Sequence, residues 1–136
     1  MQPIEFLNLA HKLIDSADEA ELRTAISRAY YYVYHSIKND LVGSDTNLTH
    51  DVMINCIQEA NINGNKVAEF EELGQTIRDL KTDRIFADYK INKSLSQETC
   101  HTMIKRCETA VEDFKECKRL GIIDAARNYL RQYKYI

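Results

Sequence analysis

Apolar residues recur every three or four positions along most of this chain, which is the spacing of amphipathic helices rather than of strands. The pattern predicts six helices. They begin near Pro3, near Asp18, near Thr49, ahead of Phe70, at Ser94 or Ser96, and near Ile123. We therefore expect an all-α, up-and-down helical bundle of five core helices plus a C-terminal helix.

Turn-forming residues separate these helices. The loop 43–47 and the Asn-rich turn 61–65 interrupt the apolar pattern. Ser94 and Gln97 have the spacing of a capping box at the start of the fifth helix, and Gly121 is placed as its C-cap. The boundaries of the fifth helix are thus predicted at both ends.

The chain has 136 residues, with only four glycines and one proline, which disfavours a sandwich or barrel of short strands. No linker, repeat or low-complexity tract divides it. We expect one domain over 1–136, with a core at about 3–119 and an added C-terminal helix at about 122–134. The absence of a long apolar run and of a basic leader predicts a cytoplasmic protein without a membrane partner.

Charge limits the ways in which this chain can bind nucleic acid. Eighteen basic and 21 acidic residues give a net charge of −3, so a general electrostatic attraction to nucleic acid is not expected. Residues 105–136 carry eight basic and five acidic groups, and the rest of the chain is acidic. Any contact with nucleic acid would therefore depend on a local patch.

Three of the four cysteines, Cys100, Cys107 and Cys117, follow the apolar stripe of the fifth helix. They are predicted to be buried, reduced and unreactive, because cysteine behaves there as a small hydrophobe. A zinc site with His101 is the alternative, but His101 lies about 100° away from the stripe. The sequence therefore predicts no metal site and no cofactor.

The second helix has a polar face separate from its aliphatic stripe. Arg28 and His35 are seven residues apart and project in nearly the same direction, with Tyr32 and Asn39 on the same face. A guanidinium can hold a phosphate through two parallel hydrogen bonds, and an imidazole can move a proton near neutral pH. This face suits metal-free attack of a ribose 2′-hydroxyl on its phosphodiester. In the alternative interpretation, Arg28 and His35 only tie the helix to its neighbours.

Three segments carry a family resemblance. The segment Ser27–His35 (SRAYYYVYH) resembles the SRAYYAxFH helix of HEPN domain proteins. Thr49–Asp51 resembles the start of the next helix in that family, and Arg84–Tyr89 resembles its RxxADY segment. The segments occur in the family's order, and the resemblance covers roughly residues 5–118.

This resemblance implies a HEPN-like bundle that commonly dimerises. Many HEPN proteins are metal-independent ribonucleases, in which an Arg and a His separated by four to six residues, from both protomers, face one cleft. By this likeness Arg28 and His35 are the catalytic pair, and Tyr32 and Asn39 are expected to contact RNA or nucleotide. Small HEPN proteins often pair with a minimal nucleotidyltransferase. The implied function is an RNA-cleaving toxin or defence effector, with a homodimer, a nucleotidyltransferase and single-stranded RNA as partners.

Two other functions stay open. Active family members usually carry Asn, Asp or His directly after the Arg, where this chain has Ala29. That difference favours a non-catalytic nucleotide- or RNA-binding module that works with a nucleotidyltransferase. A structural helical dimer is the third alternative, and the exposure of Arg28 and His35 to solvent discriminates it from the others.

Further polar residues have a structural and a functional interpretation. We interpret Arg84, Asp88 and Tyr89 as a structural polar group that fixes the join between the fourth and fifth helices. His50 either packs at its helix start or adds a third polar group beside Arg28 and His35. Tyr30, Tyr31 and Tyr34 are expected mainly to pack against neighbours.

The C-terminal helix interleaves basic and aromatic residues. Arg127 and Arg131 alternate with Tyr129 and Tyr133, as in a small single-strand-binding patch. A solvated amphipathic helix explains them equally well, because Tyr129 and Tyr133 would share an apolar stripe with Ile122.

Overall fold

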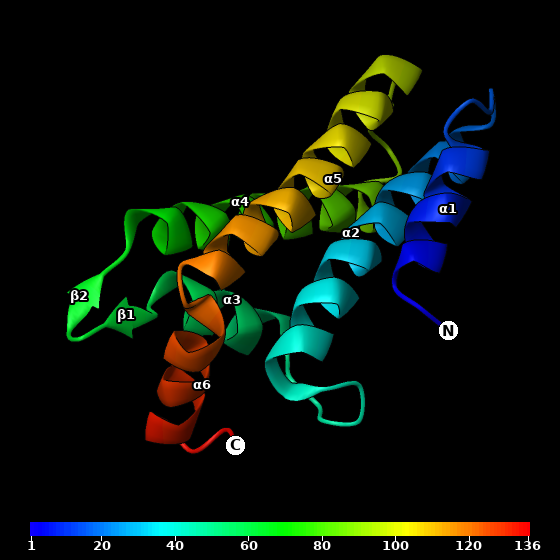
Figure 1. The fold of residues 1–136 in the computed structure, drawn as a ribbon. Helices are drawn as coiled ribbons and strands as arrows, with labels where there is room; N and C mark the ends of the chain where they lie inside the picture. The colour runs from blue at the N-terminus through cyan, green and yellow to red at the C-terminus, as the bar shows by residue number, and fades with distance from the viewer.

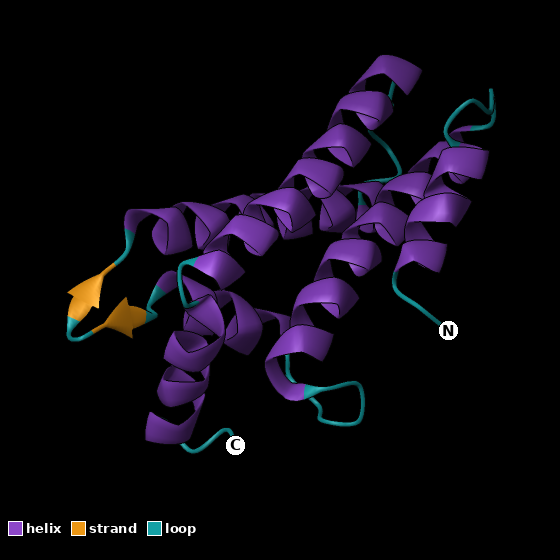
Figure 2. Ribbon diagram, in the orientation of Figure 1, coloured by secondary structure: helices purple, strands orange, loops and turns teal.

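Six helices make up most of the computed structural model, which describes all 136 residues (Figures 1 and 2). The elements are α1 (Ile4–Leu13), α2 (Glu19–Val42), α3 (His50–Gln58), β1 (Asn61–Ile62), β2 (Asn65–Lys66), α4 (Ala68–Tyr89), α5 (Gln97–Arg119) and α6 (Ile122–Gln132). The predicted all-α helical bundle is confirmed. The two-residue strands form a small antiparallel hairpin where the sequence predicted only a turn.

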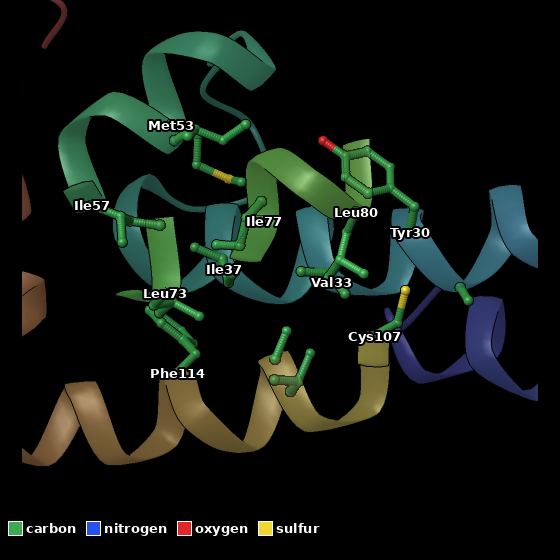
Figure 3. Packing of buried hydrophobic residues seen from close by; sticks show 14 of the residues in the cluster. Tyr30, Val33, Ile37, Met53, Ile57, Leu73, Ile77, Leu80, Cys107 and Phe114 are labelled. Atoms are coloured by element: carbon green, nitrogen blue, oxygen red, sulfur yellow. The ribbon is translucent and has the colours of Figure 1, made fainter. Parts of the chain in front are cut away.

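Helix α2 lies at the centre of the bundle and contacts α1, α4, α5 and α6. In Figure 1, α1 lies beside the first half of α2, whereas α6 lies at the far end of the molecule, next to α3 and the hairpin. One cluster of 33 buried hydrophobic residues fills the space between the helices. Figure 3 shows part of it, with Val33 and Ile37 of α2 among side chains of α3, α4 and α5.

Side-chain caps set the starts of α2, α3 and α5. The Thr49 hydroxyl accepts from the Val52 amide at the start of α3, and the Ser96 hydroxyl accepts from the Thr99 amide at the start of α5. The predicted capping box of Ser94 and Gln97 is wrong, because α5 begins at Gln97 itself. The Gln97 amide instead donates to the carbonyl of Ile14.

Two turns depend on a left-handed backbone. Asn63 and Gly64 have φ values of 54° and 83°, which suits the two-residue turn of a right-twisted hairpin. These two left-handed backbone conformations explain why a hairpin forms where a plain turn was expected. Gly121, at φ 101°, directly follows Leu120, the C-cap residue of α5, and allows α6 to begin at Ile122.

All four cysteines are buried and free, which confirms the predicted burial of the three in α5. Burial raises the pKa of the Cys107 thiol to about 12, and nearby Asp83 acts in the same direction. These thiols therefore remain protonated at neutral pH.

Helix α6 packs against the core along the predicted stripe as far as Tyr129, but not at Tyr133. Its buried residues are Ile122, Ala125, Ala126 and Leu130, and Tyr133 is 56% exposed. The expected place of Tyr133 in the apolar stripe is wrong, because α6 ends at Gln132. Arg127 has a structural role, because its Nε donates to the carbonyl of Leu41 at 2.7 Å and so links α6 to α2.

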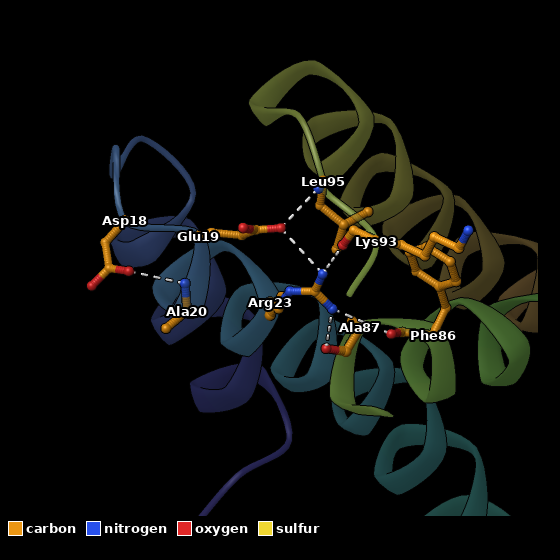
Figure 4. A network of polar contacts seen from close by, with 8 residues as sticks. All are labelled: Asp18, Glu19, Ala20, Arg23, Phe86, Ala87, Lys93 and Leu95. Atoms are coloured by element: carbon orange, nitrogen blue, oxygen red, sulfur yellow. Dashed lines mark hydrogen bonds and ion pairs between the residues drawn. The ribbon is translucent and has the colours of Figure 1, made fainter. Parts of the chain in front are cut away.

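A buried arginine in the second turn of α2 joins this helix to the end of α4 (Figure 4). Arg23 is 9% exposed, and its guanidinium donates to the carbonyls of Ala87 (2.8 Å), Phe86 (3.4 Å) and Lys93. It also pairs with the Glu19 carboxylate at 3.1 Å. Arg23 thereby satisfies carbonyls at the C-terminal end of α4, where intrahelical partners run out.

No helix has the length and apolar character needed to cross a membrane.

Candidate functional site

Tyr31 lies at the centre of a cluster of aromatic and basic side chains. Its ring centroid is 5.9 Å from that of Tyr30 and 6.1 Å from the rings of Phe6, His35 and His50. The guanidinium carbons of Arg28 and Arg84 lie 5.0 and 5.8 Å from the Tyr31 ring. We call this set, with Tyr34, the Tyr31 cluster: Phe6, Arg28, Tyr30, Tyr31, Tyr34, His35, His50 and Arg84.

Four helices supply this cluster. Helix α2 contributes Arg28, Tyr31 and His35 at helical spacings of three, four and seven, which place them along one side. Helix α1 covers that side with Phe6, α3 begins with His50, and α4 adds Arg84. The cluster thus forms only when all four helices are packed.

Arg28 has no acidic partner. Its Nη2 donates to the hydroxyl of Ser27 at 3.4 Å, and its Nε is buried without a hydrogen-bond partner. The guanidinium lies over the rings of Phe6 (5.8 Å) and Tyr31 (5.0 Å). Ring faces attract a cation but use few of its donors, so Arg28 can still bind an anion.

His35 is a half-buried imidazole held between aromatic rings. It stacks on Phe6 at 5.2 Å with 6° between the ring planes, and the Tyr34 ring meets it edge-on at 5.0 Å. Burial, and after it the charge of Lys38, lowers the pKa of His35 below its usual value. At pH 7 the imidazole is therefore neutral and can accept a proton.

Arg28 and His35 share neighbours without bonding each other. Seven residues along a helix correspond to about 10 Å, and Phe6 and Tyr31 contact both side chains across this distance. His35 also lines a pocket of about 280 Å³ with Phe6, Lys38 and Asn39. A ligand in contact with both Arg28 and His35 would therefore extend over the rings of Phe6 and Tyr31.

The structure separates Tyr32 from this cluster. Tyr32 lines a pocket toward α5 with Glu108 and Glu112, and burial raises its pKa. Asn39 borders the pocket of His35 and also one that contains Tyr32. On the Arg28 side of α2, Tyr31 is the tyrosine beside the guanidinium.

Arg84 and Asp88 form an ion pair on α4 with an N–O distance of 3.2 Å. The same Asp88 oxygen accepts from the Ser27 hydroxyl at 3.5 Å, so the pair links α4 to α2. Tyr89 is 71% exposed and lies outside this contact. Arg84 also lies 5.5 Å from the Tyr30 ring, and its Nε is buried without a partner.

His50 lies at the edge of the cluster rather than apart from it. Its Nδ1 is 2.7 Å from the hydroxyl of Tyr30, and its ring stacks on Tyr34 at 4.0 Å. The Tyr34 hydroxyl donates to the Leu48 carbonyl. Burial, with the charges of Arg84 and Lys81, lowers the pKa of His50 to about 4. Of the two interpretations of His50, the geometry fits the group beside the Arg28–His35 face.

Four members of the cluster were not singled out as site residues by sequence reasoning: Phe6, and the three tyrosines Tyr30, Tyr31 and Tyr34, which were expected mainly to pack against neighbours. Tyr31 lies inside the segment that carries the resemblance, so its neighbourhood was marked although its role was not. Nothing in the spacing of α1 distinguishes Phe6, because it also continues the apolar pattern of that helix.

A family model described as HEPN domain matches residues 4–117. A search of curated proteins and a search of solved structures found no match. The matched range runs from the start of α1 to the last turn of α5 and leaves α6 outside.

Proposed function

Because the chain belongs to the HEPN domain family, we propose that it cleaves single-stranded RNA without a metal ion, with Arg28 and His35 as its reacting pair. The observation that carries this proposal is the free charge of Arg28. This half-buried guanidinium lacks a carboxylate partner and lies near a neutral imidazole. Metal-free phosphodiester cleavage can use both groups, the imidazole to move protons and the guanidinium to stabilise the developing charge.

The reaction divides between the two side chains. His35 accepts the proton of a ribose 2′-hydroxyl, and the freed oxygen attacks the adjacent phosphorus. The bond from phosphorus to the 5′-oxygen breaks, and an imidazolium returns a proton to that leaving oxygen. Arg28 holds the phosphate and stabilises the charge that develops on its oxygens. The products are a 2′,3′-cyclic phosphate and a 5′-hydroxyl.

The rings of the Tyr31 cluster favour a single-stranded ligand. Phe6 and Tyr31 are each partly exposed next to Arg28. Unpaired bases stack on such rings, at about 1–3 kcal/mol for each base. Base pairs in a duplex would hide these faces, so RNA loops or ends are the expected substrates.

We further propose that the protein acts as a homodimer, as the toxin or defence effector paired with a minimal nucleotidyltransferase. HEPN domains commonly dimerise, and two-fold pairing would bring two Arg28–His35 sets to one cleft. Light scattering at micromolar protein should give twice the monomer mass. A clean monomer mass would remove the composite cleft.

A second candidate function is nucleotide or RNA binding without cleavage. Ala29 favours it, because active relatives usually carry Asn, Asp or His at this position, whereas this chain has a methyl group that is fully buried. The position where active relatives carry a polar side chain therefore adds no polar group to the site of this protein. Binding of single-stranded RNA by a protein that never cuts it would establish this second function.

Cleavage of single-stranded RNA in the presence of a chelator tests the leading proposal. His35→Ala should abolish cutting, and Arg28→Ala should do the same. Arg28→Lys should recover little, because a point charge does not replace a bidentate fork. Thr24→Ala, on the exposed side of α2, is the matched control and should cut like the wild type.

Three results would refute the ribonuclease proposal. They are cutting that requires a metal, cutting that survives His35→Ala, and loss of the fold in His35→Ala. The last result would favour the structural dimer, since it would assign His35 to holding the helices together.

A further inference from the structure

We propose that His50 is a second imidazole of the site, which donates a hydrogen bond from Nε2 to a phosphate oxygen of the RNA held by Arg28. This inference rests on the proposed function, because it concerns the same site. It assigns His50 a role beyond the packing of the α3 start.

Tyr30 fixes which nitrogen of His50 carries the proton. The Tyr30 side chain is fully buried, and its hydroxyl has Nδ1 of His50, at 2.7 Å, as its hydrogen-bond partner. A buried hydroxyl proton without an acceptor costs about 1–3 kcal/mol, so Tyr30 donates to Nδ1. In the neutral ring the proton then resides on Nε2.

The Nε2 atom is available to a ligand. It makes no hydrogen bond within the protein. It is also not a buried atom, because the buried side-chain polar atoms that lack a partner are only the Nε atoms of Arg28 and Arg84. His50 is half-buried, so Nε2 keeps access to solvent. The edge of His50 that carries Nε2 is therefore a free donor.

His50 lies close to the other reacting groups. The Tyr34 ring contacts both imidazoles, at 5.0 Å from His35 and 4.0 Å from His50. The Tyr31 ring is equally far from the two, at 6.1 Å. A phosphate beside Tyr31 would thus lie among Arg28, His35 and His50.

The two imidazoles are suited to different tasks. Nδ1 of His50 is already occupied by the Tyr30 proton, and burial beside Arg84 and Lys81 lowers the pKa of the ring to about 4. His50 therefore stays neutral at pH 7 and acts as a donor that keeps its proton. His35 makes no such hydrogen bond, so it remains the base.

Two substitutions separate this role from a purely structural one. In His50→Asn, the amide oxygen can replace Nδ1 as the acceptor for Tyr30, but nothing reaches the place of Nε2. In His50→Gln, the longer amide can place its NH₂ group near Nε2, while Tyr30 loses its acceptor. A structural role therefore favours Asn, whereas a ligand-donating role favours Gln.

The experiment uses the full chain, an all-ribose single-stranded oligonucleotide for cleavage, and a 2′-deoxy-substituted copy that cannot be cut for binding. His50→Asn should lower the cleavage rate by about 100-fold, as expected for loss of one oxyanion donor, with little change in thermal unfolding. His50→Gln should recover part of that rate. In the wild type, the Nε2 proton and nitrogen resonances of His50 should shift when the uncut oligonucleotide binds.

Wild-type cleavage by His50→Asn would overturn the inference, and so would oligonucleotide binding that leaves the His50 resonances unmoved. The resonance measurement needs no variant, so it decides the matter even if His50→Asn fails to fold. In either case, cleavage that still depends on His35 would leave the proposed function intact. A wild type that neither binds nor cuts RNA would remove both.

Discussion

Helix α2 carries two arginines, Arg23 and Arg28, whose surroundings differ sharply. Arg23 donates to three backbone carbonyls and pairs with Glu19. Arg28, five residues later, has one long hydrogen bond, to Ser27, and otherwise lies over aromatic rings. Both belong to one helix, and neither is fully exposed.

The difference shows that one guanidinium of α2 is bound by the fold itself, whereas the other keeps donors that a ligand could use. Carbonyl oxygens consume the donors of Arg23, which therefore has little left for a ligand. Ring faces attract the Arg28 cation without consuming its hydrogen bonds. We infer that Arg23 stabilises the fold and that Arg28 serves the site.

The largest expected effect is on stability, from removing the Arg23 donors. Arg23→Met keeps most of the side-chain volume but removes the donors to the buried carbonyl of Ala87 and to the carbonyl of Lys93. We expect a loss of about 2–5 kcal/mol in the free energy of unfolding, measured in urea. Arg28→Met is the matched control, with a change within about 1 kcal/mol.

Equal losses for Arg23→Met and Arg28→Met would contradict the division between them. That result would mean that the rings around Arg28 depend on its charge as strongly as the α4 carbonyls depend on Arg23.

The dependence of the free energy of unfolding on acidic pH gives a smaller effect. His50 binds a proton at about pH 6.5 in the unfolded chain but only at about 4 in the folded one. The unfolded chain therefore binds more protons in this window, so stability should fall as the pH drops from 6.5 to 4. Above 6.5 the contribution of His50 is fully present.

Urea unfolding at a series of pH values checks this. His50→Asn should flatten the slope between pH 4 and 6.5, where His35 and the paired carboxylates, whose pKa values are also lowered, still contribute. An unchanged slope in His50→Asn would place the titrating group elsewhere.

The smallest expected signal comes from the core cysteines. Cys100, Cys107 and Cys117 are buried on α5, and burial raises the pKa of each thiol. A bulky thiol reagent should label none of them quickly in the native protein, and all of them after unfolding. Fast native labelling of more than one thiol would show that α5 opens readily.

The fold could be predicted largely from periodicity. Six apolar stripes with few glycines and one proline leave little choice besides a helical bundle. Details that depend on a single side chain were left open or missed: the cap of α5 could be Ser94 or Ser96, and the hairpin turn at Asn63 was expected to be a plain turn. Two adjacent candidate caps, Ser94 and Ser96, have the same local chemistry, so the packing of the bundle selects between them.

The site was predictable only in part, and Tyr31 and Tyr32 explain why. At about 100° per residue, Tyr31 and Tyr32 lie about 50° on either side of the midpoint between Arg28 and His35. Spacing along α2 therefore cannot choose between them. The choice depends on neighbouring helices, since Phe6 lies against Tyr31 and α5 lies on the side of Tyr32.

The individual partners in contacts across long sequence separations could not be derived from the sequence. Arg23 meets Ala87, and His50 meets Tyr30, through packing that no local pattern encodes. The ion pair of Arg84 and Asp88 was accessible because its members are four residues apart on one helix.

Binding of the uncut single-stranded oligonucleotide to the two arginine variants tests the division between Arg23 and Arg28 most directly. The titration is carried out at a temperature where both variants remain folded. Arg28→Met should weaken binding by about 10- to 100-fold, the value of a lost charge-assisted hydrogen bond, and Arg23→Met should bind like the wild type. Wild-type affinity in Arg28→Met would contradict the account, because the free charge of Arg28 would then have no ligand to hold.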